Sequence, residues 1–178
     1  MVILEYIGKF FYDAFTNAAI LVPVIAWITA QVLKTVIYSV MYRKFSWHRM
    51  FGDGGMPSAH SATVSSLAII VGDMCGFNSP IFGFAVMFAV VVMHDAVGVR
   101  RETGKQAVTI LTIADVIKNY FDEHDLNLKT EKLKVLVGHT PLQVVLGSVL
   151  GVVIAIIYIA VCRGALGIDL SWYPQAVC

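Results

Sequence analysis

The stretch "PLQVVLGSVLGVVIAIIYIAVC", residues Pro141–Cys162, contains no charged side chain. A helix needs about 20 mainly apolar residues to cross a hydrocarbon core ~30 Å thick. The stretch also begins at a proline, which the first turn of a helix accepts because the missing N–H has no helical partner there. We therefore predict a transmembrane helix over residues 141–162.

The rest of the chain has the same character. Of its 178 residues, 58% are hydrophobic and 14% are charged, and its mean hydropathy is +0.76; an average soluble domain has about 25% charged residues. Three further segments are apolar enough to span a membrane, at residues 17–42, 58–74 and 80–97. We predict an all-α, polytopic membrane helix bundle with about four transmembrane helices, forming a single integral membrane domain over residues 1–178.

Two other segments have helical patterns. Residues 1–16 are apolar and aromatic with scattered charges, and we interpret them as a short interfacial helix. The polar region over residues 103–138 contains apolar side chains at helical spacing: Ala107, Ile110, Leu111, Ala114, Ile117 and Phe121. We expect an amphipathic, cytoplasmic segment there, lying on the membrane surface or against a partner subunit.

The basic residues are unevenly distributed. With four spans, ten of the thirteen Lys and Arg residues fall on one side: Arg43, Lys44, Arg49, Arg100, Arg101, Lys105, Lys118, Lys129, Lys132 and Lys134. The other side carries Lys9 and Arg163. Because cytoplasmic loops carry an excess of Lys and Arg, we expect the loaded side to face the cytoplasm of a bacterial plasma membrane. Basic residues that serve to bind an anion would produce the same bias.

Three polar stretches lie at span ends on this basic side. "GGMPSAHS" (54–61) leads into the second span, "HDAVGVRRETGKQ" (94–106) leaves the third, and "GHTPLQ" (138–143) enters the fourth. Ionisable residues at membrane depth are costly and are candidates for function. We predict that the three stretches form one site between helices.

The first stretch suits an anion. Gly54 and Gly55 allow backbone N–H groups to converge, and the helix start that follows adds further N–H groups and a positive dipole end. Ser58 offers a hydroxyl, and His60 can donate a proton to a ligand or leaving group. The alternative is a glycine-rich turn that caps a span, with His60 bonded to its neighbours. A nucleotide P-loop is excluded because no Gly-Lys-Ser/Thr follows.

The other two stretches supply candidate partners. His139 precedes a span at the lip of the membrane, where a neutral imidazole can attack phosphorus. Asp95 is followed by Arg100 and Arg101, whose guanidiniums suit phosphate. Lys34 lies within the first span. The alternatives are an interfacial histidine, arginines that anchor the membrane and pair with Asp95, and a lysine that snorkels to the interface.

"PSAH" and "GHTPLQVVLG" resemble the phosphate-binding motifs of the type 2 phosphatidic acid phosphatase superfamily, which includes the vanadium-dependent haloperoxidases. Together with "DAVGVRRETGKQA", they most resemble its divergent branch of small membrane proteins, over residues 34–151. The resemblance implies that His139 is the nucleophile that forms a phosphohistidine and that His60 is the general acid. It also implies that Ser58 and Lys34 bind phosphate.

The chain departs from the superfamily pattern at four places. Ala59 replaces the motif glycine, Leu133 stands where the third motif has an arginine, and no Arg-Pro follows Lys34. Arg43 or Arg49, and Arg100 or Arg101, are candidate substitutes. Gln143 replaces an aspartate four residues after the nucleophile; an amide orients an imidazole but does not stabilise an imidazolium as a carboxylate does. Asp95 is the candidate to supply that charge.

These observations predict a membrane-embedded, metal-independent phosphatase that needs no cofactor and hydrolyses a phospholipid or polyprenyl phosphate or pyrophosphate. The alternative is a non-catalytic lipid-phosphate binding, carrier or scaffold protein. A metal site formed by His60, Asp95 and His139 is a weaker reading, because their spacing matches no ligand signature. We expect the membrane but no nucleic acid as a partner. Either the N-terminal and amphipathic helices or a second copy, in a homo-oligomer, completes the bundle.

Overall fold

The computed structural model describes residues 2–43, 55–122 and 139–165. Within these ranges the chain forms six α-helices and one π-helical turn, and no strands. In chain order they are α1 (Val2–Thr16), α2 (Ala18–Tyr42), α3 (Ala59–Cys75), α4 (Pro80–Val97), α5 (Val99–Asp122), α6 (Pro141–Ala160) and η2 (Val161–Ala165). Gly54, Arg49 and residues 123–138 lie outside the described residues.

Polar caps define where the helices begin. Asn17, Ser58, Ser79 and Thr140 are the N-caps of α2, α3, α4 and α6, and each side-chain oxygen accepts a hydrogen bond from a backbone N–H in the first turn. Such a cap satisfies one of the N–H groups that a helix start leaves without a helical partner. Pro80 and Pro141 occupy the first turns of α4 and α6, as expected from the sequence.

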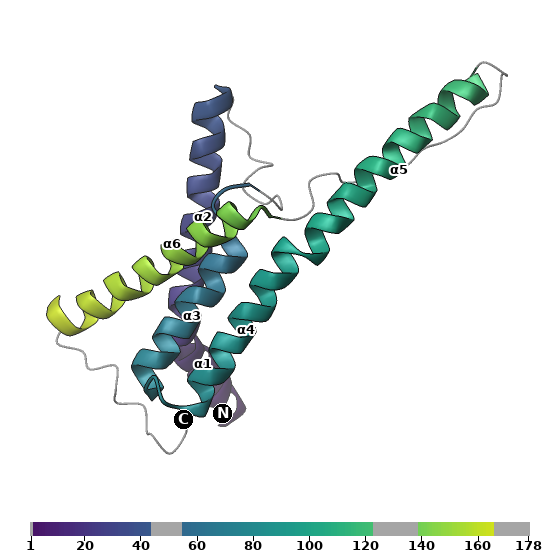
Figure 1. Ribbon diagram of the computed structural model, residues 1–178. Helices are drawn as coiled ribbons and strands as arrows, with labels where there is room; N and C mark the ends of the chain where they lie inside the picture. The colour runs from purple at the N-terminus through teal and green to yellow at the C-terminus, as the bar shows by residue number, and fades with distance from the viewer. Residues whose placement is uncertain (1, 44–54, 123–138, 166–178) are drawn as a thin grey trace.

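Helix α3 is the centre of the bundle and packs against α2, α4 and α6 (Figure 1). Ten of its seventeen residues are buried, whereas three of the eighteen residues of α4 and four of the twenty residues of α6 are buried. Seven of these ten buried residues are Ala, Ser or Gly, so the neighbours of α3 approach closely. Ala59 and Ala62 of α3 pack with Ala26 and Ala30 of α2 in one cluster.

Two glycines allow α6 to touch the backbone of α3. A Cβ added at Gly147 would overlap the carbonyl oxygen of Ser58, and one added at Gly151 would overlap that of Ala62. Glycines four residues apart are a common device for close packing of membrane helices. The spacing therefore fixes α6 against the start of α3.

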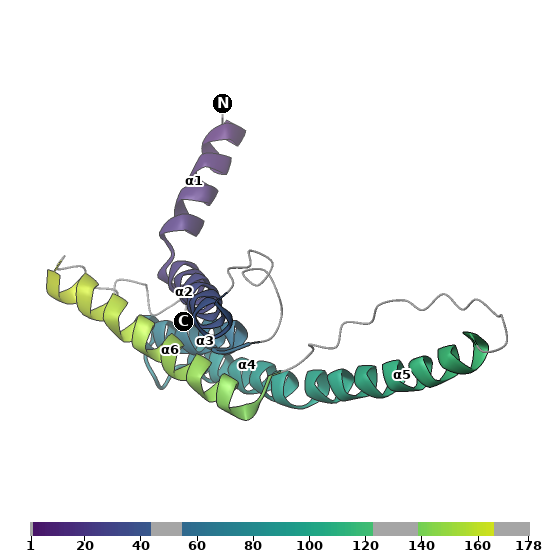
Figure 2. The same ribbon diagram turned by 90° about the horizontal axis from the view of Figure 1, so that it is seen from above.

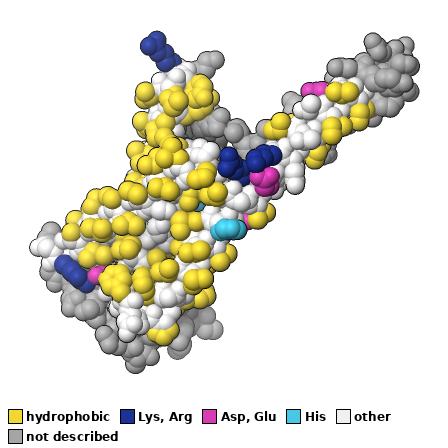
Figure 3. Space-filling view, viewed as in Figure 1, with side chains coloured by type: hydrophobic (Ala, Val, Ile, Leu, Met, Phe, Trp, Pro, Cys, Tyr) yellow, Lys and Arg dark blue, Asp and Glu magenta, His cyan; other side chains and the backbone are white. Residues whose placement is uncertain are grey.

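The apolar exterior identifies the bundle as a membrane domain. Hydrophobic side chains cover most of the face seen in Figure 3. Among the described residues, three helical stretches are long and apolar enough to cross a membrane: Ala18–Tyr42, Pro80–Ile117 and Pro141–Gly164. Helix α3 is apolar but shorter. The predicted all-α membrane helix bundle is confirmed.

Helices α1 and α5 extend away from this core (Figure 2). Helix α5 begins at Val99, directly after Gly98, and continues outward from α4 (Figure 1). The backbone N–H of Gly98 still donates to the carbonyl of His94 at 2.8 Å, so the chain passes from α4 to α5 without a loop. As a result Arg100 and Arg101 lie in the first turn of a helix.

Candidate functional site

Lys34 is buried inside the bundle. Its exposed fraction is 5%, and its Nζ donates a 2.7 Å hydrogen bond to Oε1 of Gln31, one turn earlier on α2. A lysine that snorkelled to the interface would expose its ammonium group. The burial instead holds a positive charge in the interior, where such groups are costly and mark candidate sites.

Gly55 holds the loop before α3 against Lys34. Its φ is +96°, a backbone conformation that L side chains rarely adopt, and an added Cβ would lie 3.1 Å from Cγ of Lys34. Both the dihedral angle and the contact therefore require glycine. The lysine stem on α2 and the glycine turn ahead of α3 are thus in direct contact.

Ser58 has a structural role at the start of α3. It is fully buried, and its Oγ accepts hydrogen bonds from Ser61 Oγ at 3.0 Å and from Ser61 N–H at 3.4 Å. Its backbone N–H donates to the carbonyl of Gln143 at 3.0 Å. The first turns of α3 and α6 are therefore joined.

His60 and His139 meet at this junction. His60 is half-buried in the first turn of α3, and His139, which precedes the N-cap of α6, is 5% exposed. Their ring centroids are 6.2 Å apart. The positive ends of two helix dipoles also converge here, because α3 and α6 both start at the pair. This arrangement favours an anion beside two imidazoles.

Gln143 contacts the ring of His139. Its Oε1 lies 3.2 Å from Nδ1 of His139 and accepts a 3.1 Å hydrogen bond from the backbone N–H of Thr140. Thr140 Oγ1 accepts in turn from the Gln143 N–H at 3.4 Å. This reciprocal pair is a capping box, and its pattern, Thr followed three residues later by Gln, is visible in the sequence.

Helix α4 anchors the other side of His139. The backbone N–H of His139 donates to the carbonyl of Ala96 at 3.0 Å. Asp95, which directly precedes Ala96 in the chain, is half-buried in the last turn of α4. The structure thus brings the end of α4 to the nucleophile predicted from the sequence.

The arginines lie beyond this junction. Arg101 is exposed on α5, and among the described residues no hydrogen bond or ion pair joins it to either histidine. Arg100 belongs to the same helical turn. Figure 3 shows basic side chains near the start of α5 with an acidic neighbour, where Lys105 Nζ lies 2.6 Å from Glu102 Oε1.

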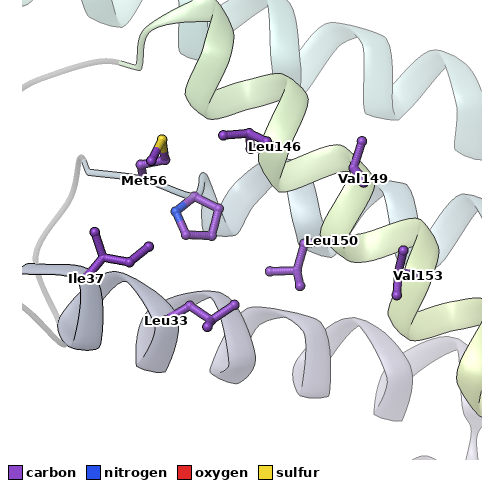
Figure 4. A pocket seen from close by; sticks show the side chains of 8 residues that line it. Leu33, Ile37, Met56, Leu146, Val149, Leu150 and Val153 are labelled. Carbon is purple, nitrogen blue, oxygen red and sulfur yellow. The ribbon is translucent and has the colours of Figure 1, made fainter.

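Two features of the site were not anticipated from the sequence. One is Ser61, whose hydroxyl donates to Ser58. The other is an apolar groove of about 330 Å³ between α2 and α6 (Figure 4). It is lined by Leu33, Ile37, Met56, Pro57, Leu146, Val149, Leu150 and Val153. Met56 and Pro57 directly follow Gly55 and precede Ser58, so the groove ends beside the polar junction.

Metal ligation has little support. Across residues 2–43, 55–122 and 139–165, no group of three or more His, Cys, Asp or Glu side chains is placed to hold a metal ion. The weaker reading, in which His60, Asp95 and His139 form a metal site, therefore finds no matching ligand cluster in the structure.

The described residues thus form an all-α membrane bundle in which two histidines lie where the starts of α3 and α6 meet. The chain belongs to the Divergent PAP2 family, which matches residues 15–154. It is also 36% identical over 151 residues to the "Uncharacterized membrane protein YuiD" of Bacillus subtilis (strain 168), covering 82% of this chain and 96% of that protein. No solved structure matches the chain. The resemblance predicted from the sequence is confirmed.

Proposed function

We propose that this PAP2-like membrane protein is a metal-independent phosphatase that hydrolyses a lipid phosphate or pyrophosphate through a phosphohistidine. The observation that carries the proposal is the His60–His139 pair, 6.2 Å apart between ring centroids where the first turns of α3 and α6 meet. A nucleophile and an acid on opposite sides of a phosphorus atom are what an in-line transfer requires.

In this proposal the phosphate binds where the positive ends of the α3 and α6 helix dipoles converge. The Lys34 ammonium, the N–H groups of Gly54 and Gly55 and the Ser58 hydroxyl contact its oxygens. Arg100 and Arg101, in the first turn of α5 beyond the junction, are the further cations that the proposal assigns to this phosphate. Support comes from the Lys34 stem, which is buried against Gly55 in the loop that leads to α3, and from the two helix starts, whose dipole ends are positive.

The proposed chemistry has two steps. A lone pair on the His139 ring attacks phosphorus, the bond from phosphorus to the lipid oxygen breaks, and His60 gives its proton to that oxygen. A water then attacks the phosphohistidine, returning one proton to His60 and releasing phosphate, so the histidines end as they began. Asp95 is the proposed source of negative charge near the His139 imidazolium.

The groove supports a lipid substrate. Every side chain that lines it is apolar, and it ends at Met56 and Pro57 beside the proposed phosphate site. A hydrocarbon chain in the groove would therefore leave its phosphate next to Ser58 and the histidine pair. Such a chain would enter sideways from the bilayer.

The positive-inside bias supports a site that faces the cytoplasm, and we propose a bacterial plasma membrane as its location. Residue-specific labelling of single cysteines introduced at Arg43 and Arg163, with a reagent that does not cross membranes, tests this orientation. Labelling of the Arg43→Cys variant from outside would overturn it.

A non-catalytic lipid-phosphate binder is the second candidate. Gln143 favours it, because its neutral amide stands beside His139 where the superfamily has a carboxylate. Such a protein would retain the anion pocket and the groove but would not form a phosphohistidine.

An assay of phosphate release separates these candidates. In it, purified protein is offered phosphatidic acid, phosphatidylglycerol phosphate or undecaprenyl pyrophosphate, with chelator present. We expect phosphate release that His139→Ala abolishes. His94→Ala, a change of an exposed histidine on α4, is the matched control and should retain activity. Absence of release from all three lipids with unchanged lipid binding would favour the binder, whereas loss of release on chelation would favour a metal.

A further inference from the structure

We infer that Gln143 is a positioning residue that holds the neutral His139 ring with its proton on Nδ1 and its lone pair on Nε2. That Nε2 is the attacking atom rests on the proposed function. The tautomer itself follows from hydrogen bonds around α6 and is independent of any reaction.

The first step concerns which end of the Gln143 amide faces His139. The atom at 3.2 Å from Nδ1 also lies 3.1 Å from the backbone N–H of Thr140, which is a donor and has no acceptor capacity. If the amide were flipped, its NH₂ group would face that N–H and the cap would be lost. The capping box therefore requires the amide oxygen at this position.

The second step concerns the proton on the ring. A carbonyl oxygen only accepts hydrogen bonds, so the Nδ1 atom beside it must carry the hydrogen. A neutral imidazole carries a single N–H, which leaves the lone pair on Nε2. One half of the capping box, the hydrogen bond from the Thr140 N–H to Gln143 Oε1, thus determines the tautomer of a histidine that precedes the helix.

The third step concerns rigidity. The carbonyl of Gln143 accepts from Ser58 N–H at 3.0 Å, and the N–H of His139 donates to Ala96 at 3.0 Å. The backbone segments that carry the amide and the imidazole are therefore held by α3 and α4 respectively. A side chain that is held in this way orients its partner without a large entropic cost.

The neutrality of Gln143 has a consequence for pH dependence. A carboxylate at this distance favours the imidazolium and raises the histidine pKa, whereas an amide adds no charge. The ring with Gln143 therefore stays neutral, and nucleophilic, to lower pH than it would with Glu. His60 on α3, whose ring centroid lies 6.2 Å from that of His139, Asp95 on α4 and Lys34 on α2 are the same in both cases.

The experiment is ¹⁵N NMR of histidine-labelled full-length protein in lipid nanodiscs, with the His139 signals assigned through His139→Ala. We expect the Nδ1–H tautomer in the unmodified protein. Gln143→Leu should lose it, and Gln143→Glu should retain it while raising the pH at which the ring titrates, because a carboxylate favours the imidazolium. An Nε2–H ring in the unmodified protein, or an unchanged tautomer in Gln143→Leu, would overturn the inference.

Thr140→Ala is the matched control for loss of the cap. It removes the hydrogen bond to the Gln143 N–H but leaves the Thr140 N–H and Gln143 Oε1 in place. We expect a lower Tm, a normal tautomer and normal turnover. Gln143→Leu should lower kcat by about 10- to 100-fold with little change in KM. The Nδ1–H tautomer in a protein that releases no phosphate would preserve this inference and refute the proposed function.

Discussion

The backbone N–H of Ser58 donates a 3.0 Å hydrogen bond to the carbonyl of Gln143, so the helices that carry the two histidines start from a shared bond. Ser58 caps α3 two residues before His60, and Gln143 lies four residues after His139. Since both histidines are so close in sequence to this bond, anything that separates α3 from α6 also separates the rings.

Gly147→Ala tests that dependence. The added Cβ would overlap the Ser58 carbonyl oxygen, and overpacking of this kind typically costs about 1–3 kcal/mol. We expect a lower Tm in detergent and a weakened or lost site. Gly83→Ala, on α4, is the control because a Cβ there meets nothing within 4 Å. Equal stability of the two variants would contradict the close approach of α6 to α3.

Gly55→Ala tests the contact with Lys34. At positive φ an alanine costs roughly 1–2 kcal/mol, and the new Cβ would lie 3.1 Å from Lys34 Cγ. Gly76→Ala carries a similar dihedral cost, at φ +89°, with nothing within 4 Å. We expect Gly55→Ala alone to weaken phosphate-headgroup binding, measured by calorimetry with a lipid phosphate. The same loss of binding in both variants would show that the contact with Lys34 is not its cause.

His60→Ala tests the role of the proton donor. General acid catalysis contributes typically about 10²–10⁴-fold when the leaving group is a poor one. A lipid alkoxide needs that proton, whereas p-nitrophenolate leaves readily without it. We expect a large loss of turnover with phosphatidic acid and a much smaller one with p-nitrophenyl phosphate. Equal losses with the two substrates would exclude His60 as the acid.

Val153→Trp tests the groove. This side chain lines the groove and is 44% exposed, so a bulkier residue fills the groove with little effect on the core. We expect about tenfold lower kcat/KM for a long-chain lipid phosphate, the effect of ~1.4 kcal/mol, with p-nitrophenyl phosphate unaffected. Ile156→Trp, on an exposed part of the same helix, should leave both substrates unaffected; a matching loss there would indicate a general effect of tryptophan on α6.

Arg163→Met tests stability at the other end of the bundle. Arg163 donates to Asp73 at 2.6 Å, and the Asp73 side chain is only 9% exposed. The Arg163 side chain is 48% exposed, so water screens the pair, and removing the arginine should cost less than the ~3–5 kcal/mol of a fully buried pair and more than the ~0–1 kcal/mol of an exposed one. We expect a lower Tm in detergent. The double variant Arg163→Met/Asp73→Asn should recover part of the lost Tm. A double variant that is less stable than Arg163→Met would contradict this account.

The sequence predicted the parts of the site that depend on chain order. Pro80 and Pro141 indicated helix starts, and counting spans placed the stretches with His60 and His139 at the same face. Their ring contact follows from that placement together with the small residues of α3. The composition and the three motifs were also sufficient to indicate the family.

Other relationships depend on packing that no local pattern reveals. Nothing in the sequence pairs Lys34 with Gly55, because the contact depends on how closely α2 approaches the turn before α3. The expected boundary near residue 103 was also later than the observed start of α5. Gly98 and Gly104 resemble helix breakers, yet the Gly98 N–H keeps its bond to His94 and the helical path continues.

The glycine contacts between α6 and α3 also bear on how the protein is made. Helix α6 is the last long helix among the described residues, and domains generally fold from the N-terminus during synthesis. Until Gly147 and Gly151 reach the backbone of α3, His139 has no fixed place beside His60. The two histidines therefore come together only when α6 packs on α3.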